Sequence, residues 1–405
     1  MAYMRSLTQF SRKDLIVVIS IFVLMFFIYW ASAWRTGSIQ TPPTAYFSEL
    51  AISFLDGKLF LENPQSVHDL TLYQGKWYVP FLPLPSFLML PWIALFGTIN
   101  TVVFSAVLGA VNVSLVFLII HGLIRSNWIN LRYIDSIWLT ILFGIGSVHW
   151  YISTFGSVWY ISQLCTVTFS ALAVWLTIIS RKPLLAGLAL GAALWARPHI
   201  ILIYPLLVGI GCMGLQETIP NLRKAYLIRW IGSSILPLFV SIFGILFYNW
   251  LRFDSMLDFG YINENVATHL RFNLVTYGQF NLRYIPQNLW AMLLALPIWD
   301  GKSLIPDGSG MSLLITSPAL IFLFKARQRS PIVLGAWFSI FLILIPLMLY
   351  YNTGWYQFGY RFSLDFMIPI MVLLAYASQK KIPDLMKILI ILGVFVNMWG
   401  ITWRG

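Results

Sequence analysis

The chain has 405 residues, of which 59% are hydrophobic and only 10% are charged. A soluble domain of this length cannot bury that much apolar surface, so the composition excludes an ordinary soluble protein. The formal net charge of +12 is concentrated in short connections between apolar runs, which is typical of a membrane protein and argues against a nucleic-acid-binding one. We therefore predict an all-α, polytopic membrane protein.

The first apolar run extends from Leu15 to Trp34 and follows the basic residues Arg5, Arg12 and Lys13. It ends in Ala-Ser-Ala, which resembles a signal-peptide cleavage site, but it is longer than the hydrophobic region of a cleavable signal peptide. We therefore predict an uncleaved first membrane helix with its basic N-terminus in the cytoplasm.

Further apolar segments bring the predicted number of membrane spans to about 11 or 12, because each is long enough to approach the ~30 Å hydrocarbon core as a helix. The segments lie at about residues 82–98, 99–124, 133–149, 157–180, 183–196, 199–214, 231–251, 311–326, 331–351, 364–379 and 383–402. The chain is thus predicted to form one integral membrane domain over residues 1–405. Two long polar stretches, 35–81 and 252–307, are the predicted first and second extracytoplasmic loops.

Most basic residues lie in the connections on one side of the predicted membrane segments. That set of connections holds 16 of the 26 Lys and Arg but only four acidic residues, whereas the other set holds ten of each sign. The entire net charge therefore falls on one side, which the positive-inside rule identifies as cytoplasmic. The basic residues of that side are Arg5, Arg12, Lys13, Arg125, Arg132, Arg181, Lys182, Arg223, Lys224, Arg229, Lys325, Arg327, Arg329, Lys380, Lys381 and Lys387.

Residues 82–98 are the exception to this pattern, because a span there would place every later basic connection on the outside. Pro83, Pro85 and Pro91 interrupt the segment, and prolines remove backbone donors and kink helices. We therefore favour a re-entrant or interfacial segment over a membrane span.

The first outer loop contains two acidic residues of interest, Glu49 and Asp69. Residues 44–59 place apolar side chains at helical spacing, with Glu49 on another side and Gly57 at the end, which predicts an amphipathic helix lying on the bilayer. Downstream, His68, Asp69 and Lys76 precede a proline-broken hydrophobic run. In the plainer interpretation, Glu49 faces water and Asp69 caps a turn.

Residues 195–199 interrupt an otherwise apolar stretch at the predicted outer surface. Arg197 and His199 are difficult to explain as packing residues there, and a guanidinium at a helical break beside the headgroups is suited to binding a phosphate. The alternative is an arginine that extends to ordinary lipid phosphates. Trp159 belongs to a nearby aromatic connection that fits either a membrane-interface belt or a sugar pocket.

Arg361 and Asp365 stand four residues apart at the start of a helix, so we expect them to form an ion pair that supports the loop over the site. Three other outer acids, Glu62, Glu264 and Asp307, are flanked by Asn, Pro or Gly. We interpret these three as solvated loop charges.

Short motifs of the chain resemble those of the GT-C superfamily of membrane glycosyltransferases, which includes protein O-mannosyltransferases and lipid A aminoarabinose transferases. The resemblance extends over most of the chain and is to a bacterial branch of the superfamily. It rests on Tyr46-Phe47 with Leu50-Ala51, LDGKL (55–59), His68-Asp69-Leu70, YQGKWYVP (73–80), GSVW (156–159), Ala196-Arg197-Pro198, YNWLRF (248–253), Phe259-Gly260-Tyr261 and FGYRF (358–362).

The resemblance implies a polytopic fold whose first outer loop bears interfacial helices and catalytic acids. It further implies a protein of the bacterial inner (plasma) membrane that transfers a sugar from a polyprenyl-phosphate carrier to an acceptor hydroxyl on the extracytoplasmic face. The partners would be the lipid-linked donor, membrane lipids and an acceptor that is a protein, a lipid or a glycan. No nucleic acid is expected.

Such a donor already carries a stable anionic leaving group, so the reaction needs a base for the acceptor hydroxyl and a cation for the phosphate, and one displacement inverts the anomeric centre. The expected residues are Asp69 and Glu49 as base, Arg197, His199, Lys76 and His68 for the phosphate or donor, and Tyr46, Trp159 and Arg361 for acceptor binding or support. No metal-ligand spacing is present and we assign no cofactor, although Asp69 with His68 leaves a divalent metal open.

Three other functions remain open from the residues alone. A secondary transporter has a similar size, but it predicts matched halves and ionisable residues near the bilayer centre, and neither is apparent. A polymerase or ligase of surface polysaccharide also uses lipid-linked sugars and relies on a late outer loop such as residues 252–307. A non-catalytic membrane scaffold has no positive sign in the sequence.

Overall fold

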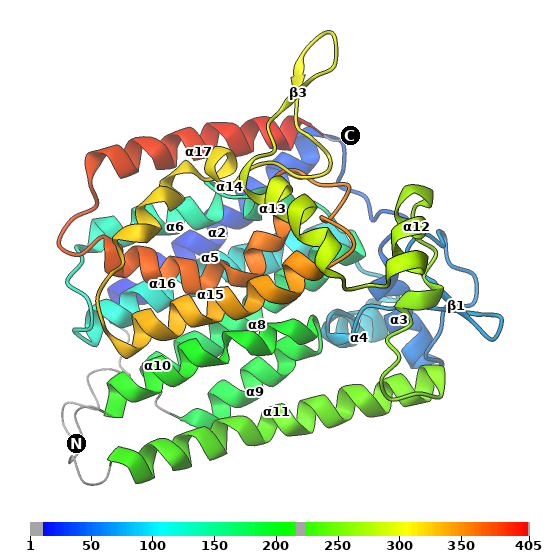
Figure 1. Ribbon diagram of the computed structural model, residues 1–405, viewed down its shortest axis with the longest axis horizontal. Coiled ribbons are helices and arrows are strands. Elements are labelled where there is room, and N and C mark those ends of the chain that lie inside the picture. The colour runs from blue at the N-terminus through cyan, green and yellow to red at the C-terminus, as the bar shows by residue number, and fades with distance from the viewer. Residues whose placement is uncertain (1–10, 181, 216–222, 404–405) are drawn as a thin grey trace.

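The structure, a computed structural model, describes residues 11–180, 182–215 and 223–403, and helices account for nearly all of its regular elements (Figure 1). Six of the described helices are apolar and long enough, by length and composition, to cross a membrane. They are α2 (Arg12–Arg35), α5 (Thr101–Arg125), α8 (Val158–Ile179), α11 (Arg223–Phe253), α15 (Pro331–Leu349) and α17 (Asp384–Thr402). The predicted all-α, polytopic membrane fold is confirmed.

The remaining apolar segments form shorter or interrupted helices. They are α6 (Tyr133–Gly144), α7 (His149–Ile152), α9 (Pro183–Leu194), η1 (Pro198–Ile203), α10 (Tyr204–Leu215), α14 (Leu313–Thr316), η5 (Pro318–Lys325), η6 (Arg361–Phe366) and α16 (Met367–Ala377). Proline explains some of the interruptions, because it lacks a backbone donor and disfavours helical geometry in the residue before it. Ser317, for example, is non-helical directly before Pro318 and divides the span predicted at 311–326.

Helix α5 is central in the bundle and packs against α2, α6 and α8. Helix α9 packs against both α8 and α11, and α15 packs against α10 and α16. Glycines allow the closest of these approaches. A Cβ atom at Gly209 of α10 would collide with the carbonyl oxygen of Pro331, and one at Gly335 of α15 would collide with that of Pro205. The α10–α15 contact therefore depends on a glycine in each helix.

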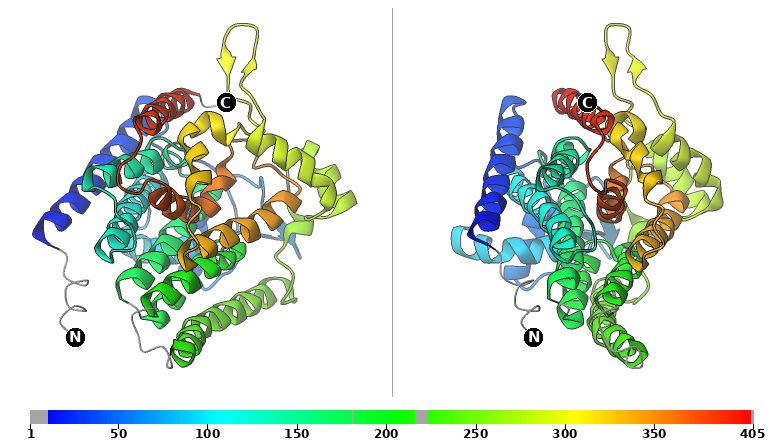
Figure 2. Two further views of the ribbon diagram at one scale, coloured as in Figure 1. Left: turned by 60° about the vertical axis from the view of Figure 1, so that its left-hand side comes forward. Right: turned by 90° about the vertical axis from the view of Figure 1, so that its left-hand side faces the viewer.

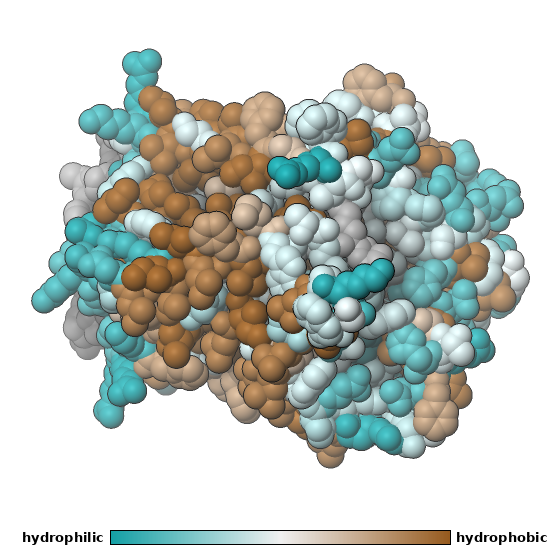
Figure 3. Space-filling model, turned by 90° about the horizontal axis from the view of Figure 1, so that it is seen from above, coloured by the Kyte–Doolittle hydropathy of each residue, from teal (hydrophilic) through white to brown (hydrophobic). Residues whose placement is uncertain are grey.

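The bundle has two chemically different ends. The α5–α6, α8–α9 and α16–α17 connections, which carry predicted cytoplasmic charges, lie together at the left-hand end of Figure 1. Figure 3 shows hydrophilic residues gathered at that end and a broad apolar band next to them. Exposed apolar side chains such as Phe27, Phe243 and Phe341 face outward from the long helices, as lipid-facing residues do. Arg5, Arg181, Glu217 and Arg404 lie outside the described residues.

The two predicted outer loops lie at the opposite end and form defined structure. They contain α3 (Tyr46–Leu55), β1 (Thr71–Tyr73), β2 (Lys76–Tyr78), η3 (Tyr261–Asn263), α12 (Thr268–Tyr277), η4 (Leu282–Tyr284), α13 (Ile285–Leu293), β3 (Ile298–Trp299) and β4 (Leu304–Ile305). Strands β1 and β2 pair as an antiparallel hairpin, and so do β3 and β4, whose hairpin projects from the body at the top of Figure 1.

The amphipathic helix expected at residues 44–59 is observed as α3, and Gly57 follows it with a φ of 70°. Helix α4 (Leu84–Phe96), in the segment predicted to be re-entrant or interfacial, packs against α3. Its 13 residues extend about 20 Å at 1.5 Å per residue, which is too short for a hydrocarbon core of ~30 Å. Its length agrees with a segment that does not cross the membrane.

Candidate active site

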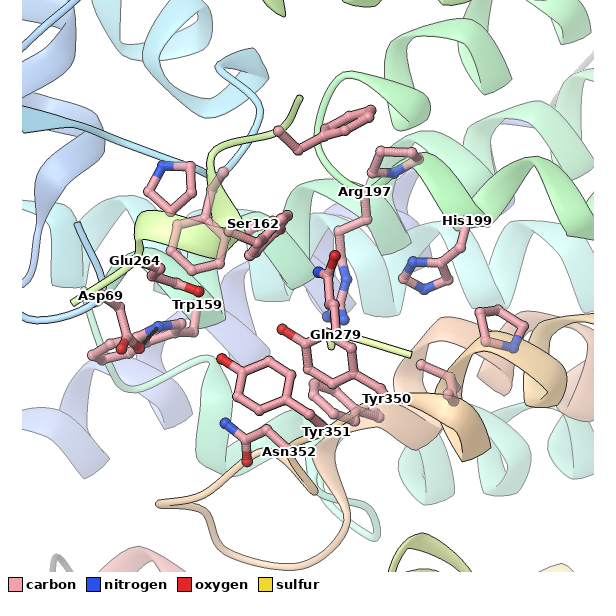
Figure 4. Close-up of a pocket in the computed structure, with 18 of the residues that line it drawn as sticks. Asp69, Trp159, Ser162, Arg197, His199, Glu264, Gln279, Tyr350, Tyr351 and Asn352 are labelled. Carbon is pink, nitrogen blue, oxygen red and sulfur yellow. Dashed lines mark hydrogen bonds between the residues drawn. The ribbon is translucent and has the colours of Figure 1, made fainter. Parts of the chain in front are cut away.

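A cavity of about 240 Å³ opens at the end of the bundle that carries the outer loops. Its walls come from the segment before β1, the N-terminal end of α8, the break between α9 and η1, the second outer loop and the chain after α15. Figure 4 shows Asp69 and Glu264 on one side of this cavity and Arg197 and His199 on the other, with Tyr350 and Tyr351 between them. The cavity thus brings an acidic and a cationic side face to face.

Three contacts fix Asp69 at the cavity wall. Its backbone N–H donates to the carbonyl of Asn265 (3.0 Å), and the indole Nε1 of Trp159 donates to its Oδ2 (3.0 Å). The hydroxyl of the fully buried Tyr46 donates to the carbonyl of His68, the preceding residue (2.6 Å). Asp69 itself has a φ of 54°, a conformation that aspartate tolerates better than most residues. The carboxylate is therefore held in place from the first loop, the second loop and α8.

Burial raises the pKa of Asp69 above its ordinary value of 3.8. The neighbouring His68, whose Nε2 lies 3.7 Å from Oδ1, the Trp159 indole and the charge of Arg361 act in the opposite direction. A carboxylate with a raised pKa is a stronger base than one in water, which suits it to accept a proton from a hydroxyl group.

The cationic side of the cavity results from the break after α9. Helix α9 ends at Leu194, and Arg197 is extended because Pro198 follows it. The backbone of this break is tied down by two hydrogen bonds: Leu84 N–H donates to the carbonyl of Trp195 (3.0 Å), and Ser162 Oγ donates to that of Ala196 (3.1 Å).

Asp365 holds Arg197 and His199 together. Its Oδ2 lies 2.9 Å from His199 Nε2 and 3.3 Å from Arg197 Nη2, and Gln163 Nε2 donates to its Oδ1 (3.2 Å). Asp365 therefore orients the Arg197 guanidinium and the His199 imidazole at the cavity.

The expected ion pair between Arg361 and Asp365 is wrong. Arg361 lines the cavity, but its Nε donates to the carbonyl of Gly354 (3.2 Å), and its guanidinium lies over the rings of Tyr160 and Phe362. The interpretation failed because residues 361–366 form a 3₁₀-helix, in which side chains four apart do not share a face.

The interpretation of Glu264 as a solvated loop charge is also wrong. The residue is only 7% exposed, lines the cavity beside Asp69, and burial raises its pKa well above 4.5, with the charge of Asp69 adding to the shift. It follows Gly260, where a Cβ atom would collide with Phe253 and Thr71, so this turn packs tightly on the β1 strand. The Phe-Gly-Tyr motif at 259–261 was the sequence signal for that close approach.

Other residues of the cavity were not predicted. Gln279, Tyr350, Tyr351, Asn352 and Trp355 contribute polar groups and aromatic faces. An apolar rim is formed by Pro80, Phe81, Leu82, Phe280, Pro346 and Leu347. Ile345, next to Pro346 on α15, is exposed on the outside of the bundle. The rim thus adjoins the apolar surface of the protein.

Four predicted residues lie outside the cavity lining: Glu49, Lys76, His68 and Tyr46. Glu49 on α3 accepts a hydrogen bond from the backbone of Gln65, and Lys76 is exposed on β2 with its ammonium 4.5 Å from the centre of the Phe60 ring. We therefore do not include either in the site. His68 contacts the site through Asp69 and through an edge contact with the ring of Trp159, at 5.9 Å between centroids.

Among the described residues, no group of three or more His, Cys, Asp or Glu side chains is arranged to hold a metal ion. His68 and Asp69 supply at most two ligands at one place, and Glu264 a carboxylate nearby. The arrangement instead offers two carboxyl groups, the guanidinium groups of Arg197 and Arg361, the imidazole of His199 and several hydroxyl and indole donors around one cavity.

These features define an integral membrane protein with a polar cavity at one end of an apolar helical bundle. Comparison with known protein families finds no matching family, and comparison with curated proteins finds no match. Among solved structures, the chain is similar to the crystal structure of ArnT from Cupriavidus metallidurans bound to undecaprenyl phosphate, with a TM-score of 0.48 and 10% sequence identity. The similarity covers 90% of this chain and 59% of that one, so the chain spans little more than half of the length of that protein.

Proposed function

We propose that the protein is a glycosyltransferase that moves a hexosyl or pentosyl group from a polyprenyl-phosphate carrier to an acceptor hydroxyl, with inversion. The observation that carries the proposal is a cavity in which the half-buried Asp69 lies across from Arg197 and His199. The motifs shared with GT-C glycosyltransferases supply the substrate class.

In the proposed reaction Asp69 accepts the proton of the acceptor hydroxyl while that oxygen attacks the anomeric carbon. The bond between the anomeric carbon and the phosphate oxygen breaks, and its electron pair leaves with the polyprenyl phosphate. The leaving phosphate gains negative charge in the transition state, and Arg197 and His199 stabilise it. Asp365 orients the two cations for this role.

The apolar rim explains how a long isoprenoid carrier is accommodated. Pro346 and Leu347 belong to the rim, and the exposed Ile345 beside them faces away from the bundle. A carrier whose phosphate lies at Arg197 can therefore pass its tail over this rim and into the surrounding lipid. The distribution of basic residues supports an extracytoplasmic location of the site and a cytoplasmic N-terminus.

The test is transfer by the purified protein in lipid nanodiscs, with a panel of polyprenyl-phosphate hexoses and pentoses and release of polyprenyl phosphate as the measurement. We expect D69N to lower turnover about 10²- to 10⁴-fold, because that is the usual contribution of a general base. D56N is the matched control, since Asp56 is an exposed acid of the same loop and lies outside the cavity lining. Full activity of D69N, or no consumption of any donor by the wild-type protein, would reject the proposal.

A second candidate is a polymerase or ligase of surface polysaccharide, which uses the same kind of donor. It is favoured by the contribution of the second outer loop, which places Tyr261 and Glu264 in the cavity wall. The two activities differ in the acceptor, so products that grow by many sugar units on a glycan acceptor would favour the polymerase over transfer of a single sugar.

A further inference from the structure

The two carboxyl groups of the cavity come from different outer loops that are joined along their backbones. Asp69 N–H donates to the carbonyl of Asn265 (3.0 Å), Asn265 N–H donates to that of Leu70 (2.8 Å), and Thr71 pairs with Glu264 as an antiparallel bridge. This short ladder brings the loops together at one place. Backbone hydrogen bonds between the two loops therefore hold Asp69 and Glu264 near each other.

Glu264 carries a buried atom that nothing in the described chain satisfies. Its Oε2 is inaccessible to solvent and has no hydrogen-bond partner among the described residues, although the carboxyl lines the cavity and Tyr351 forms a side-chain hydrogen bond to it. A buried polar atom without a partner is costly, so such atoms are uncommon except where a ligand supplies the missing contact. The proposed mechanism gives Glu264 no role, which leaves this group unexplained.

The charges around the pair are distributed unevenly. The titratable and charged groups that face the pair are His68 from the first loop, Tyr261 from η3, Tyr350 and Tyr351 from the end of α15, Arg361 from η6 and Arg197 across the cavity. Burial raises the pKa of both carboxyl groups, but His68, Trp159 and Arg361 oppose it at Asp69, whereas at Glu264 the charge of Asp69 adds to it and only a hydrogen bond from Tyr351 opposes it. A negative charge is therefore better placed on Asp69 than on Glu264, and two charges in one buried site repel each other.

We propose that Asp69 and Glu264 form a pair that binds one proton and carries one negative charge, in which the neutral carboxyl of Glu264 donates a hydrogen bond to a hydroxyl oxygen of the bound sugar. Glu264 is then a specificity-determining residue for a hydroxyl-bearing sugar ring, and Asp69 remains the base. The inference rests on the proposed transferase function for its substrate. The state of the pair itself depends only on the fold.

The first test compares E264Q with E264A in the nanodisc transfer assay. Glutamine keeps a neutral donor of the same shape, so E264Q should retain activity within about threefold, whereas E264A should lose about ten- to a hundredfold. Wild-type activity should fall at high pH, where the pair loses its one proton, and E264Q should lack this alkaline limb. Equal losses in E264Q and E264A, or an unchanged alkaline limb in E264Q, would overturn the inference.

The second test does not depend on turnover. Infrared spectroscopy of the protein in nanodiscs at neutral pH should detect the C=O stretch of a protonated carboxylic acid, and this band should be absent from E264Q. A wild-type protein that shows the band but transfers no sugar would contradict the proposed function and leave the pair intact. A protein that transfers sugar but lacks the band would contradict the pair alone.

Discussion

Asp365 is the residue on which the cationic side of the cavity depends. It is 2% exposed and contacts Arg197, His199 and Gln163, which come from two other segments of the chain. Asp365 therefore fixes the position of the phosphate-binding groups.

We expect D365N to weaken donor binding more than it slows the chemical step. Asparagine leaves Arg197 and His199 without their buried counter-ion, and breaking such a pair costs enough to raise KM for the polyprenyl-phosphate donor about tenfold or more. Steady-state kinetics with separate KM and kcat values provide the measurement. D254N is the control, because Asp254 is an exposed acid that accepts hydrogen bonds from Tyr73 and Gln74. An unchanged KM in D365N would show that Asp365 does not position these cations.

Helix α9 illustrates how an element, rather than a single residue, makes the site. The helix stops before Pro198, and this break turns Arg197 and His199 toward the outer loops. Sequence reasoning identified the break because proline has a definite effect on the backbone. It could not identify what the break faces, since Asp365 lies 166 residues further along the chain from His199.

At the level of elements, the α10–α15 contact should be sensitive to a single methyl group. G335A places a Cβ atom against the backbone of Pro205, so we expect a loss of about 1–3 kcal/mol in stability and a Tm several degrees lower. The matched control is G232A in α11, where an added Cβ meets no atom within 4 Å. Thermal unfolding in detergent measures both variants. Equal Tm values for G335A and G232A would mean that this helix contact is looser than the structure indicates.

The whole molecule is polarised along the length of its long helices. Basic connections lie at one end, the exposed apolar side chains cover the middle, and the cavity lies among the outer loops at the other end. The positive-inside rule assigns the basic end to the cytoplasm, so a donor sugar would be used on the extracytoplasmic side.

This orientation predicts opposite labelling of two single cysteines. In intact cells treated with a membrane-impermeant maleimide, K302C at the tip of the β3–β4 hairpin should be labelled within minutes, whereas K381C between α16 and α17 should react only after the cells are opened. Both lysines are exposed, so accessibility within the protein does not distinguish them. The native Cys165 is buried and Cys212 is half-buried, which limits background. The reverse labelling pattern would invert the proposed topology.

The sequence by itself determined the class of protein, the two ends of the bundle and part of the site. Composition, charge distribution and the spacing of apolar residues are properties of the chain alone. They were sufficient to predict an all-α membrane protein with an amphipathic helix within residues 44–59, which is observed as α3. Asp69, Arg197, His199, Trp159 and Arg361 were all chosen from their local context, and all five line the cavity. Charged and aromatic residues at the breaks between apolar segments can be recognised from the sequence without knowing the fold.

Only the tertiary structure decided which residues act together. Glu264 has the local sequence of a solvated turn, yet the ladder between the two outer loops buries it beside Asp69. Asp365 lies four residues after Arg361, but a 3₁₀ turn directs it to Arg197 and His199 instead. Burial and ion pairing depend on contacts between segments far apart in the chain, and hydrophobic periodicity and charge counts carry no information about those contacts.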